Sequence, residues 1–283
     1  MIILHDPQCA EYGSFMRPEQ PARITRSVSY LRQAHPDWTW QIPPIADEAV
    51  LRLAHSPAML RRVQQPADLD EDTPYFPGIY DHARRSVGAA LAAAKLAGEG
   101  KKAFALMRPP GHHATRDQAM GFCYLNQIAI TALAVAATGT RVAVWDFDAH
   151  HGNGTEAILA GTAHTRFVSG HQYPGYPGTG TRSFDNIANF PVAPHTPRAT
   201  HLTALARSWE DVLAFKPDLV LVSAGFDAYV DDPITEMTLE TNDFAELGRW
   251  LSQGALPAAA VLEGGYSEDL PRLIDAFLSA WDR

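Results

Sequence analysis

Uninterrupted apolar runs that end in glycine-bearing polar turns recur along this chain. Four such runs occupy residues 103–107, 142–145, 219–222 and 258–262. Runs of four or five apolar residues bounded by turns are typical of strands buried on both faces of a sheet. Residues 1–4 form a further candidate strand at the start of the chain.

Segments with apolar residues at helical spacing separate these runs. The alanine-rich segment 80–96 is followed by Gly98 and Gly100, which favour helix termination. Segment 125–137 is apolar on most faces, so this helix is expected to be buried. Further helices are predicted at 22–32, 58–63, 202–215, 241–251 and 270–281.

The alternation of strands and helices predicts an α/β fold with an open, mainly parallel sheet and helices on both faces. We expect residues 1–283 to form a single domain, because no internal repeat or low-complexity linker interrupts them. Long loops beside strand ends commonly build a binding site. Such loops are predicted at 8–21, 67–79, 112–124, 171–200 and 227–240.

The turn after the second run carries two carboxylates and an imidazole. Asp146, Asp148 and His150 alternate along the sequence, so a continuing strand would point them to the same side. The glycines that follow, Gly152 and Gly154, are expected to end the strand and open a loop. Ligands bind at the carboxyl edge of open α/β sheets. The pattern therefore predicts half of a metal site.

The other three turns supply reactive groups for the same edge. Asp227 follows the third run and completes a three-ligand set with Asp148 and His150, which leaves a fourth position for water, as in catalytic zinc sites. His112 and His113 follow the first run and suit a general base and acid.

Two further residues complete the predicted chemistry. Asp146 is placed to accept the outer N–H of one imidazole and so fix its tautomer. Tyr266, on a Gly-Gly turn, is placed to donate to a developing oxyanion. Together the groups predict metal-assisted hydrolysis of an amide.

Composition narrows the class of protein. A net charge of −9 argues against a nucleic-acid-binding surface and is weakly compatible with a cationic substrate. Two cysteines are too few for a disulfide framework and fit a reducing compartment. Residues 128–137, the longest mainly apolar stretch, are too short to span a bilayer, and no signal peptide is visible. We expect a cytoplasmic protein that does not bind membranes.

The motifs together resemble the histone deacetylase superfamily, in particular its class II branch and the bacterial relatives that include acetylpolyamine amidohydrolases. They occur in the family's order and cover nearly the whole chain. The stretches that carry the resemblance are residues 17–23, 108–114, 121–126, 146–154, 176–180, 223–233 and 262–266.

The resemblance implies an arginase-like α/β fold and a zinc-dependent deacetylase with one Zn²⁺ per chain. By family position, the zinc ligands are Asp148, His150 and Asp227. The tandem catalytic histidines are His112 and His113, and the catalytic tyrosine is Tyr266. The substrate implied is an acylated lysine or a related small N-acyl amine.

The resemblance also implies a substrate channel and a second ion. Phe122 and Tyr176 match the aromatic pair that lines the acyl-lysine channel, with Gly121 beside it. The family carries a buried monovalent cation, usually K⁺. By position, its ligands are the Asp146 carboxylate, Ser169, and the backbone of Asp148, His150 and Gly170.

The chain departs from the family pattern at several positions. Arg17 replaces the usual histidine before Pro-Glu, and Gln127 replaces the usual acid or amide after Asn126. Asn153 stands where class I enzymes have an aspartate, so His113 has a neutral partner. None of these changes removes a catalytic group.

Ile234 bears on substrate choice. Some class II relatives place an acid directly after the Asp-Pro that follows the zinc aspartate, and the apolar Ile234 offers no charge there. This favours acyl-lysine or a broad range of small N-acyl amines over strict polyamine specificity. An inward fold of Glu19, Asp231 or Glu236 would still supply a carboxylate.

Two other functions compete with a deacetylase. A two-metal ureohydrolase shares the fold but needs further carboxylates where Gly152 and Tyr229 stand. A non-catalytic protein that binds acylated ligands would not need both histidines and Tyr266. The sequence does not predict an oligomeric state.

Overall fold

A single eight-stranded sheet organises the computed structural model, which describes residues 1–283. The strand order is β2-β1-β3-β8-β7-β4-β5-β6, and every pair is parallel. All strands therefore end at one edge. Their bounds are β1 Ile2–Leu4, β2 Thr39–Gln41, β3 Ala103–Ala105, β4 Val142–Asp146, β5 Thr165–Gln172, β6 Ile187–Val192, β7 Leu219–Ala224 and β8 Ala258–Leu262.

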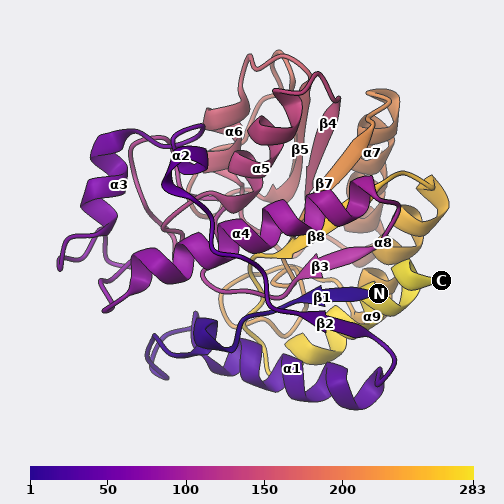
Figure 1. The fold of residues 1–283 in the computed structure, drawn as a ribbon. Coiled ribbons are helices and arrows are strands. Elements are labelled where there is room, and N and C mark those ends of the chain that lie inside the picture. The colour runs from indigo at the N-terminus through magenta and orange to yellow at the C-terminus, as the bar shows by residue number, and fades with distance from the viewer.

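Helices cover both faces of the sheet (Figure 1), which confirms the predicted fold class. The helices α4 and α5 lie against one face, where α4 contacts β3 and β8 and α5 contacts β4. On the other face, Trp145 of β4 packs against Trp209 of α7 and Trp250 of α8. The bounds are α1 Ala22–Ala34, α2 Glu48–Leu51, α3 Pro57–Val63, α4 Ile79–Gly98, α5 Gln127–Ala136, α6 Asn153–Leu159, α7 Arg198–Ala214, α8 Thr241–Gly254 and α9 Leu270–Asp282, with a 3₁₀ turn at Pro7–Ala10.

The sequence prediction was wrong at two loops. Segment 171–200 contains the strand β6, which lies at the edge of the sheet. An edge strand tolerates Pro191, because proline has no N–H to donate to a neighbouring strand. The expected loop after Gly152 is instead α6. Its Gly154 looked like a turn residue, but a Cβ there would lie 2.3 Å from the carbonyl oxygen of Ala114, so the glycine serves close packing.

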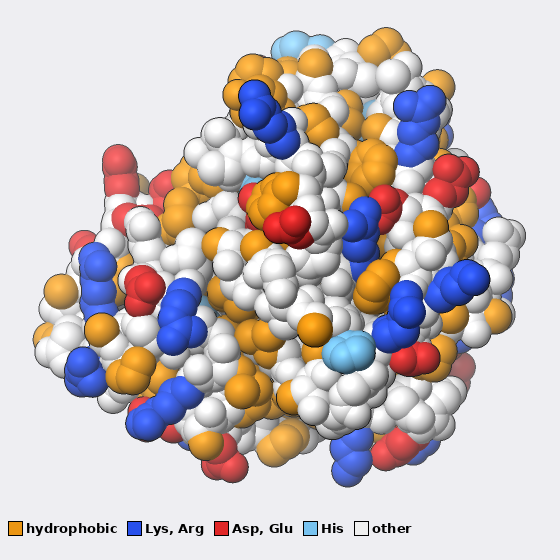
Figure 2. All heavy atoms as spheres, turned by 90° about the horizontal axis from the view of Figure 1, so that it is seen from above, with side chains coloured by type: hydrophobic (Ala, Val, Ile, Leu, Met, Phe, Trp, Pro, Cys, Tyr) orange, Lys and Arg blue, Asp and Glu red, His pale blue; other side chains and the backbone are white.

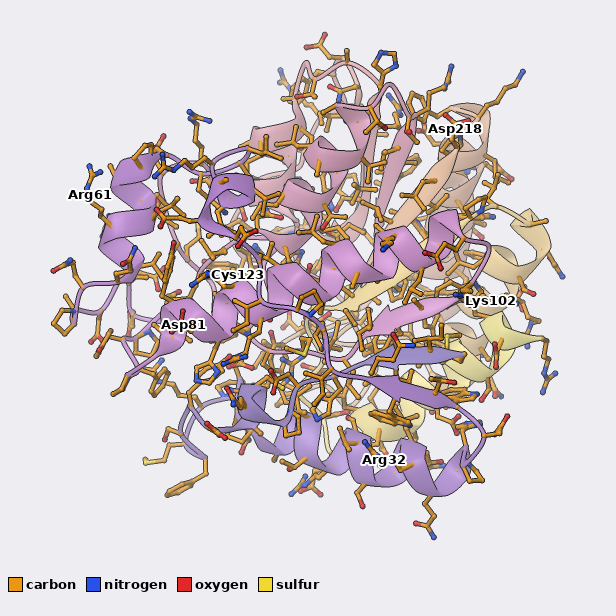
Figure 3. The ribbon with its side chains drawn as sticks, viewed as in Figure 1. Arg32, Arg61, Asp81, Lys102, Cys123 and Asp218 are labelled. Atoms are coloured by element: carbon orange, nitrogen blue, oxygen red, sulfur yellow. The ribbon has the colours of Figure 1, made fainter.

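Two apolar clusters form the interior. The larger contains 57 buried residues between the sheet and its helices, and the smaller contains 14 residues beneath α2, α3 and the start of α4. Charged side chains such as Arg61, Asp81 and Asp218 extend from the periphery, whereas Cys123 lies inside (Figure 3). Acidic and basic side chains are interspersed over the face seen in Figure 2. None of the helices combines the length and apolar character needed to cross a bilayer.

Gly248 allows α8 and α9 to pack closely. A Cβ at Gly248 would lie 2.2 Å from the carbonyl oxygen of Phe277 in α9. A Cβ at Gly98, at the end of α4, would have no atom within 4 Å. The two helical glycines therefore form a matched pair, one closely packed and one open.

We predict opposite effects of alanine at these two glycines. Gly248→Ala should lower the free energy of unfolding by about 1–3 kcal/mol, because overpacking outweighs the gain in helix propensity. Gly98→Ala should change it by between zero and about +1 kcal/mol. Denaturant unfolding measures both changes, and equal effects would contradict the packing role of Gly248.

His55 ties the turn between α2 and α3 to the loop that follows β3. Its ring is fully buried, its Nδ1 lies 2.9 Å from the Thr115 carbonyl oxygen, and its Nε2 lies 2.9 Å from the Asn126 backbone N–H that donates to it. These contacts require a neutral ring protonated at Nδ1. Burial lowers the pKa of His55 to about 4, from an ordinary value of 6.5.

We predict a loss of stability as pH falls from about 6.5 toward 4, because the unfolded chain then binds a proton that the folded chain excludes. At pH 5 the titration of His55 lowers the free energy of unfolding by about 2 kcal/mol. A His55→Gln variant lacks this titration. The amount by which its free energy of unfolding falls below that of wild type should therefore be about 2 kcal/mol smaller at pH 5 than at pH 7. An equal deficit at both pH values in denaturant unfolding would refute the prediction.

Candidate active site

Four adjacent strands, β3, β8, β7 and β4, each continue into a reactive turn at the carboxyl edge of the sheet. The turn after β3 carries His112 and His113, and the turn after β8 carries Tyr266. The turns after β7 and β4 carry the residues predicted to bind metal. Because the strands are parallel neighbours, the sheet brings these distant segments together.

Local hydrogen bonds orient the residues after β4. The strand ends at Asp146, so strand alternation does not reach Asp148 and His150 as the sequence predicted. Instead, the Asp148 N–H donates to Asp146 Oδ1 at 3.1 Å, and the His150 N–H donates to Asp148 Oδ1 at 2.9 Å. Two successive side chain-to-backbone turns thus aim both side chains into the site.

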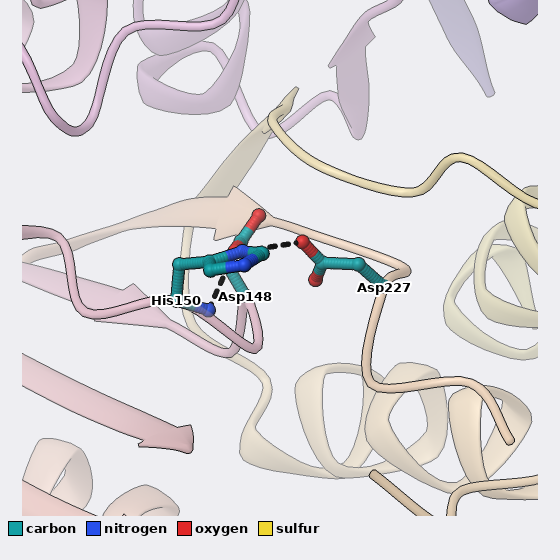
Figure 4. Close-up of side chains that lie close together, drawn as sticks. All are labelled: Asp148, His150 and Asp227. Carbon is teal, nitrogen blue, oxygen red and sulfur yellow. Dashed lines mark hydrogen bonds and ion pairs between the residues drawn. The ribbon is translucent and has the colours of Figure 1, made fainter. Parts of the chain in front are cut away.

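Asp148, His150 and Asp227 form a group whose ligand atoms all lie within 4.8 Å of one another. His150 Nδ1 lies 3.2 Å from Asp148 Oδ1 and 2.9 Å from Asp227 Oδ2 (Figure 4). The remaining oxygens are held by the backbone, because the Ala149 N–H donates to Asp227 Oδ1 and the Gly264 N–H donates to Asp148 Oδ2. Two carboxylates and one imidazole fit a divalent ion such as zinc.

The electrostatics of this group also fit a cation. Asp148 and Asp227 are fully buried, and their ion-pair partners are imidazoles rather than lysine or arginine. Burial and the charge of Asp148 raise the pKa of Asp227. Burial opposes ionisation of Asp148 too, but the charges of His112 and His150 outweigh it and lower the pKa of Asp148. A bound cation would supply the missing positive charge.

Two glycines make room for the carboxylates. A Cβ at Gly225 would lie 2.0 Å from Asp148 Oδ2, and a Cβ at Gly264 would lie 2.3 Å from Asp227 Oδ2. Both glycines stand in the turns after β7 and β8. They are therefore required by the close packing of these carboxylates.

The paired histidines have different partners. His112 Nδ1 lies 3.0 Å from Asp146 Oδ2, whereas His113 Nδ1 lies 2.8 Å from Asn153 Oδ1. Burial lowers the pKa of His112, but the charges of Asp146 and Asp148 overcome this and raise it to about 10. Burial, followed by the charges of His112 and His150, lowers the pKa of His113 well below its ordinary value. Adjacent imidazoles with opposite pKa shifts are typical of acid–base sites.

A pocket of about 270 Å³ opens above this group. His113, His150 and Tyr266 line it, whereas His112, Asp146 and Asn153 do not. The ring of Phe122 lies 5.7 Å from that of Tyr266. All four residues predicted for the substrate channel also line it: Gly121, Phe122, Tyr176 and Ile234.

Two residues that sequence reasoning did not single out hold Tyr266. The Tyr266 N–H donates to Asp232 Oδ2 at 2.7 Å, and the Arg23 guanidinium lies 4.7 Å from the centre of the Tyr266 ring. Arg23 also donates to the carbonyl oxygens of Gly265 at 2.7 Å and Glu263 at 2.5 Å. Arg23 and Asp232 lie within residues 17–23 and 223–233, which carry the family resemblance. Their contacts at residues 263–266 are distant in the sequence, so the pairing could not be predicted from it.

The acids proposed from the sequence for the pocket mouth do not line it. Glu19 is buried and forms ion pairs with Arg108 at 2.5 Å and Arg23 at 3.3 Å. Asp231 and Glu236 are exposed outside the pocket. Asp72, from the 67–79 loop, is the carboxylate at the mouth, and Arg17 lies there as well.

The residues predicted for a monovalent cation belong to β4, to the turn that follows it and to β5. Asp146 of β4 pairs in register with Ser169 of β5, and both are fully buried. The Ser169 hydroxyl lies 2.9 Å from His171 Nδ1. Gly170 follows in the same strand, where a Cβ would lie 2.7 Å from Leu205.

The chain is similar to known deacetylases. A family model for the histone deacetylase domain matches residues 17–281. The histone deacetylase-like amidohydrolase of Pseudomonas aeruginosa is 39% identical over 249 residues, which cover 80% of this chain and 65% of that protein. The acetylpolyamine amidohydrolase of Burkholderia pseudomallei is 35% identical over 258 residues, which cover 86% and 75% of the two chains.

Solved structures agree with these relatives. A crystal structure of the acetylpolyamine aminohydrolase from Burkholderia pseudomallei matches with a TM-score of 0.90 at 28% identity and covers 99% of this chain and 98% of that one. The HDA15 HD domain matches with a TM-score of 0.89 at 27% identity and covers 99% and 88%. The resemblance inferred from the motifs is thereby confirmed, and the chain belongs to the histone deacetylase family.

Proposed function

We propose that this protein is a zinc-dependent deacetylase that removes an acetyl or other acyl group from the amine of a lysine side chain or a small amine. The observation that carries the proposal is a single pocket lined by His150 of the metal-binding group, by His113 and by Tyr266. These are a metal ligand, a proton carrier and an oxyanion donor. Amide hydrolysis requires all three functions.

Asp148, His150 and Asp227 would hold one Zn²⁺ per chain. When bound, zinc would polarise the substrate carbonyl and lower the pKa of a coordinated water. Three protein ligands favour this assignment over a two-metal ureohydrolase, because neither Gly152 nor Tyr229 adds a carboxylate to the group.

His113 is assigned the proton transfers. It lines the pocket and its lowered pKa keeps it neutral, so it can accept a proton from water and deliver it to the leaving amine. Asn153 fixes its orientation without adding charge. His112, held by Asp146, contributes positive charge from behind His113.

Tyr266 is assigned to the oxyanion. Burial raises its pKa well above the ordinary value, so the phenol keeps its proton and can donate it as a hydrogen bond. Asp232 and Arg23 position its backbone and ring. Retention of these groups favours an enzyme over a protein that only binds acylated ligands.

Gly121, Phe122, Tyr176 and Ile234 would enclose the alkyl chain of the substrate. These walls accept an acyl-lysine or an acetylpolyamine equally well. Relatives named acetylpolyamine amidohydrolase and the carboxylate of Asp72 at the mouth support the polyamine alternative.

We also propose that one K⁺ is bound by Asp146, by Ser169 and by the backbone of Asp148, His150 and Gly170. The β4–β5 register supports this, because it pairs Asp146 with Ser169 and so brings the two oxygen-bearing side chains together.

Hydrolysis should depend on one tightly bound divalent ion. Asp227→Ala and His150→Ala should each lose the ion and the activity together, because each removes one of three ligands. Asp231→Ala, an exposed aspartate four residues away, is the matched control. Metal analysis and hydrolysis of an acetyl-lysine reporter, before and after chelation, test this, and two divalent ions per active chain would overturn it.

Tyr266→Phe should lower kcat by roughly 10²–10³-fold, the cost of one lost oxyanion donor. KM should change less, because the hydrogen bond strengthens in the transition state. Metal content and folding should be retained, and Tyr30→Phe, on the exposed side of α1, serves as the control. Steady-state kinetics with near wild-type turnover would remove Tyr266 from the mechanism.

A further inference from the structure

Two oppositely charged side chains at the pocket mouth have no part in the proposed hydrolysis. Arg17 from the 8–21 loop and Asp72 from the 67–79 loop line the same pocket as His113, His150 and Tyr266. Asp72 is exposed and Arg17 is half-buried, whereas His113 is buried, so the two charges lie toward the solvent end of the pocket, where a substrate's distal group would be. Their charges therefore bear on which amines the site selects.

Most hydrogen-bond donors of Arg17 are uncommitted. Its side chain makes one hydrogen bond, from Nη1 to the carbonyl oxygen of Glu71 at 3.0 Å, and it forms no ion pair. A guanidinium carries five N–H donors. By contrast, Arg108 donates to both Glu19 oxygens and to backbone carbonyls, so its charge is fully committed.

Asp72 does not neutralise Arg17. Burial and the charges of Asp70 and Glu71 raise the pKa of Asp72, and Arg17 opposes this only in part. Arg17 and Asp72 line the same pocket but form no ion pair with each other, so the mouth presents a cation and an anion that are not paired. A free guanidinium recognises a carboxylate through two parallel hydrogen bonds and repels an ammonium group.

We propose that Arg17 binds a carboxylate at the distal end of the substrate, so that the site selects N-acylated amines that carry a free carboxylate, such as free Nε-acetyl-lysine. The α-ammonium group of Nε-acetyl-lysine would face Asp72. This inference rests on the proposed deacetylase function. An acetylpolyamine offers only a cation to the mouth, and an acetyl-lysine within a protein offers two uncharged amides.

The test compares ligands that differ only in their distal group. The probes are 6-acetamidohexanoate, its uncharged analogue 6-acetamidohexanamide, N-acetylcadaverine and Nε-acetyl-L-lysine, each tested with the metal-loaded protein. The carboxylate should be preferred over the amide by roughly 5- to 20-fold, as one partly exposed charge-assisted contact allows. Nε-acetyl-lysine should be preferred over N-acetylcadaverine, which lacks only the carboxylate.

The variants assign the preference to Arg17. Arg17→Gln should bring the carboxylate-to-amide ratio to about 1, and Arg17→Lys should retain part of it. Arg62→Gln is the matched control, because Arg62 also donates to a backbone carbonyl of the 67–79 loop, that of Leu69, but lies outside the pocket. Its ratio should match that of wild type.

The two proposals can fail separately. The ratio is taken from kcat/KM when the ligands are hydrolysed and from a calorimetric Kd when they are not, so absence of turnover counts against the deacetylase function alone. A wild-type ratio near 1, a preference for N-acetylcadaverine, or a ratio unchanged in Arg17→Gln would overturn the assignment of Arg17.

Discussion

Two aspartates buried side by side without an arginine or lysine partner are the constraint on which this structure depends. Asp148 and Asp227 have no solvent exposure, and such carboxylates are costly to bury unless hydrogen bonds and opposite charge compensate them. Backbone N–H groups of Ala149 and Gly264 supply hydrogen bonds from two different strand ends. The β4, β7 and β8 turns must therefore keep their relative positions for either carboxylate to be satisfied.

A second layer of buried charge reinforces this edge of the sheet. Glu19 bridges Arg108 and Arg23, and Arg23 donates to the backbone carbonyls of Glu263 and Gly265 at the Gly-Gly turn. Glu263 accepts the Gly111 N–H at 2.7 Å, which links the turn after β8 to the turn that carries the histidines. Removing one member leaves the others as unpaired buried groups, so the layer favours one arrangement of the turns.

The sequence predicted what depends on local pattern. The strands β3, β4, β7 and β8 are buried throughout, are apolar apart from Asp146 and Ser223, and end in chemically distinctive turns. The four segments of the candidate site could therefore be found and assigned to one edge. The strand β5 was not predicted, because Thr165, Arg166 and His171 interrupt its apolar run. Its strand conformation depends on pairing with β4 and β6, which a local pattern does not show. Likewise, no local signal shows which loop acid reaches the pocket mouth. Asp72 rather than Asp231 lies there because of the path of the 67–79 loop.

The two ends of the chain meet at the edge of the sheet opposite the pocket. The Met1 ammonium lies 3.1 Å from an Asp282 carboxylate oxygen, and Lys102, just before β3, donates to the Trp281 carbonyl oxygen at 2.5 Å. These contacts join the strands β1 and β3 to the end of α9 at the amino edge of the sheet. The reactive turns all lie at the carboxyl edge, so the bonds that fasten α9 to the sheet are separate from the chemistry of the pocket.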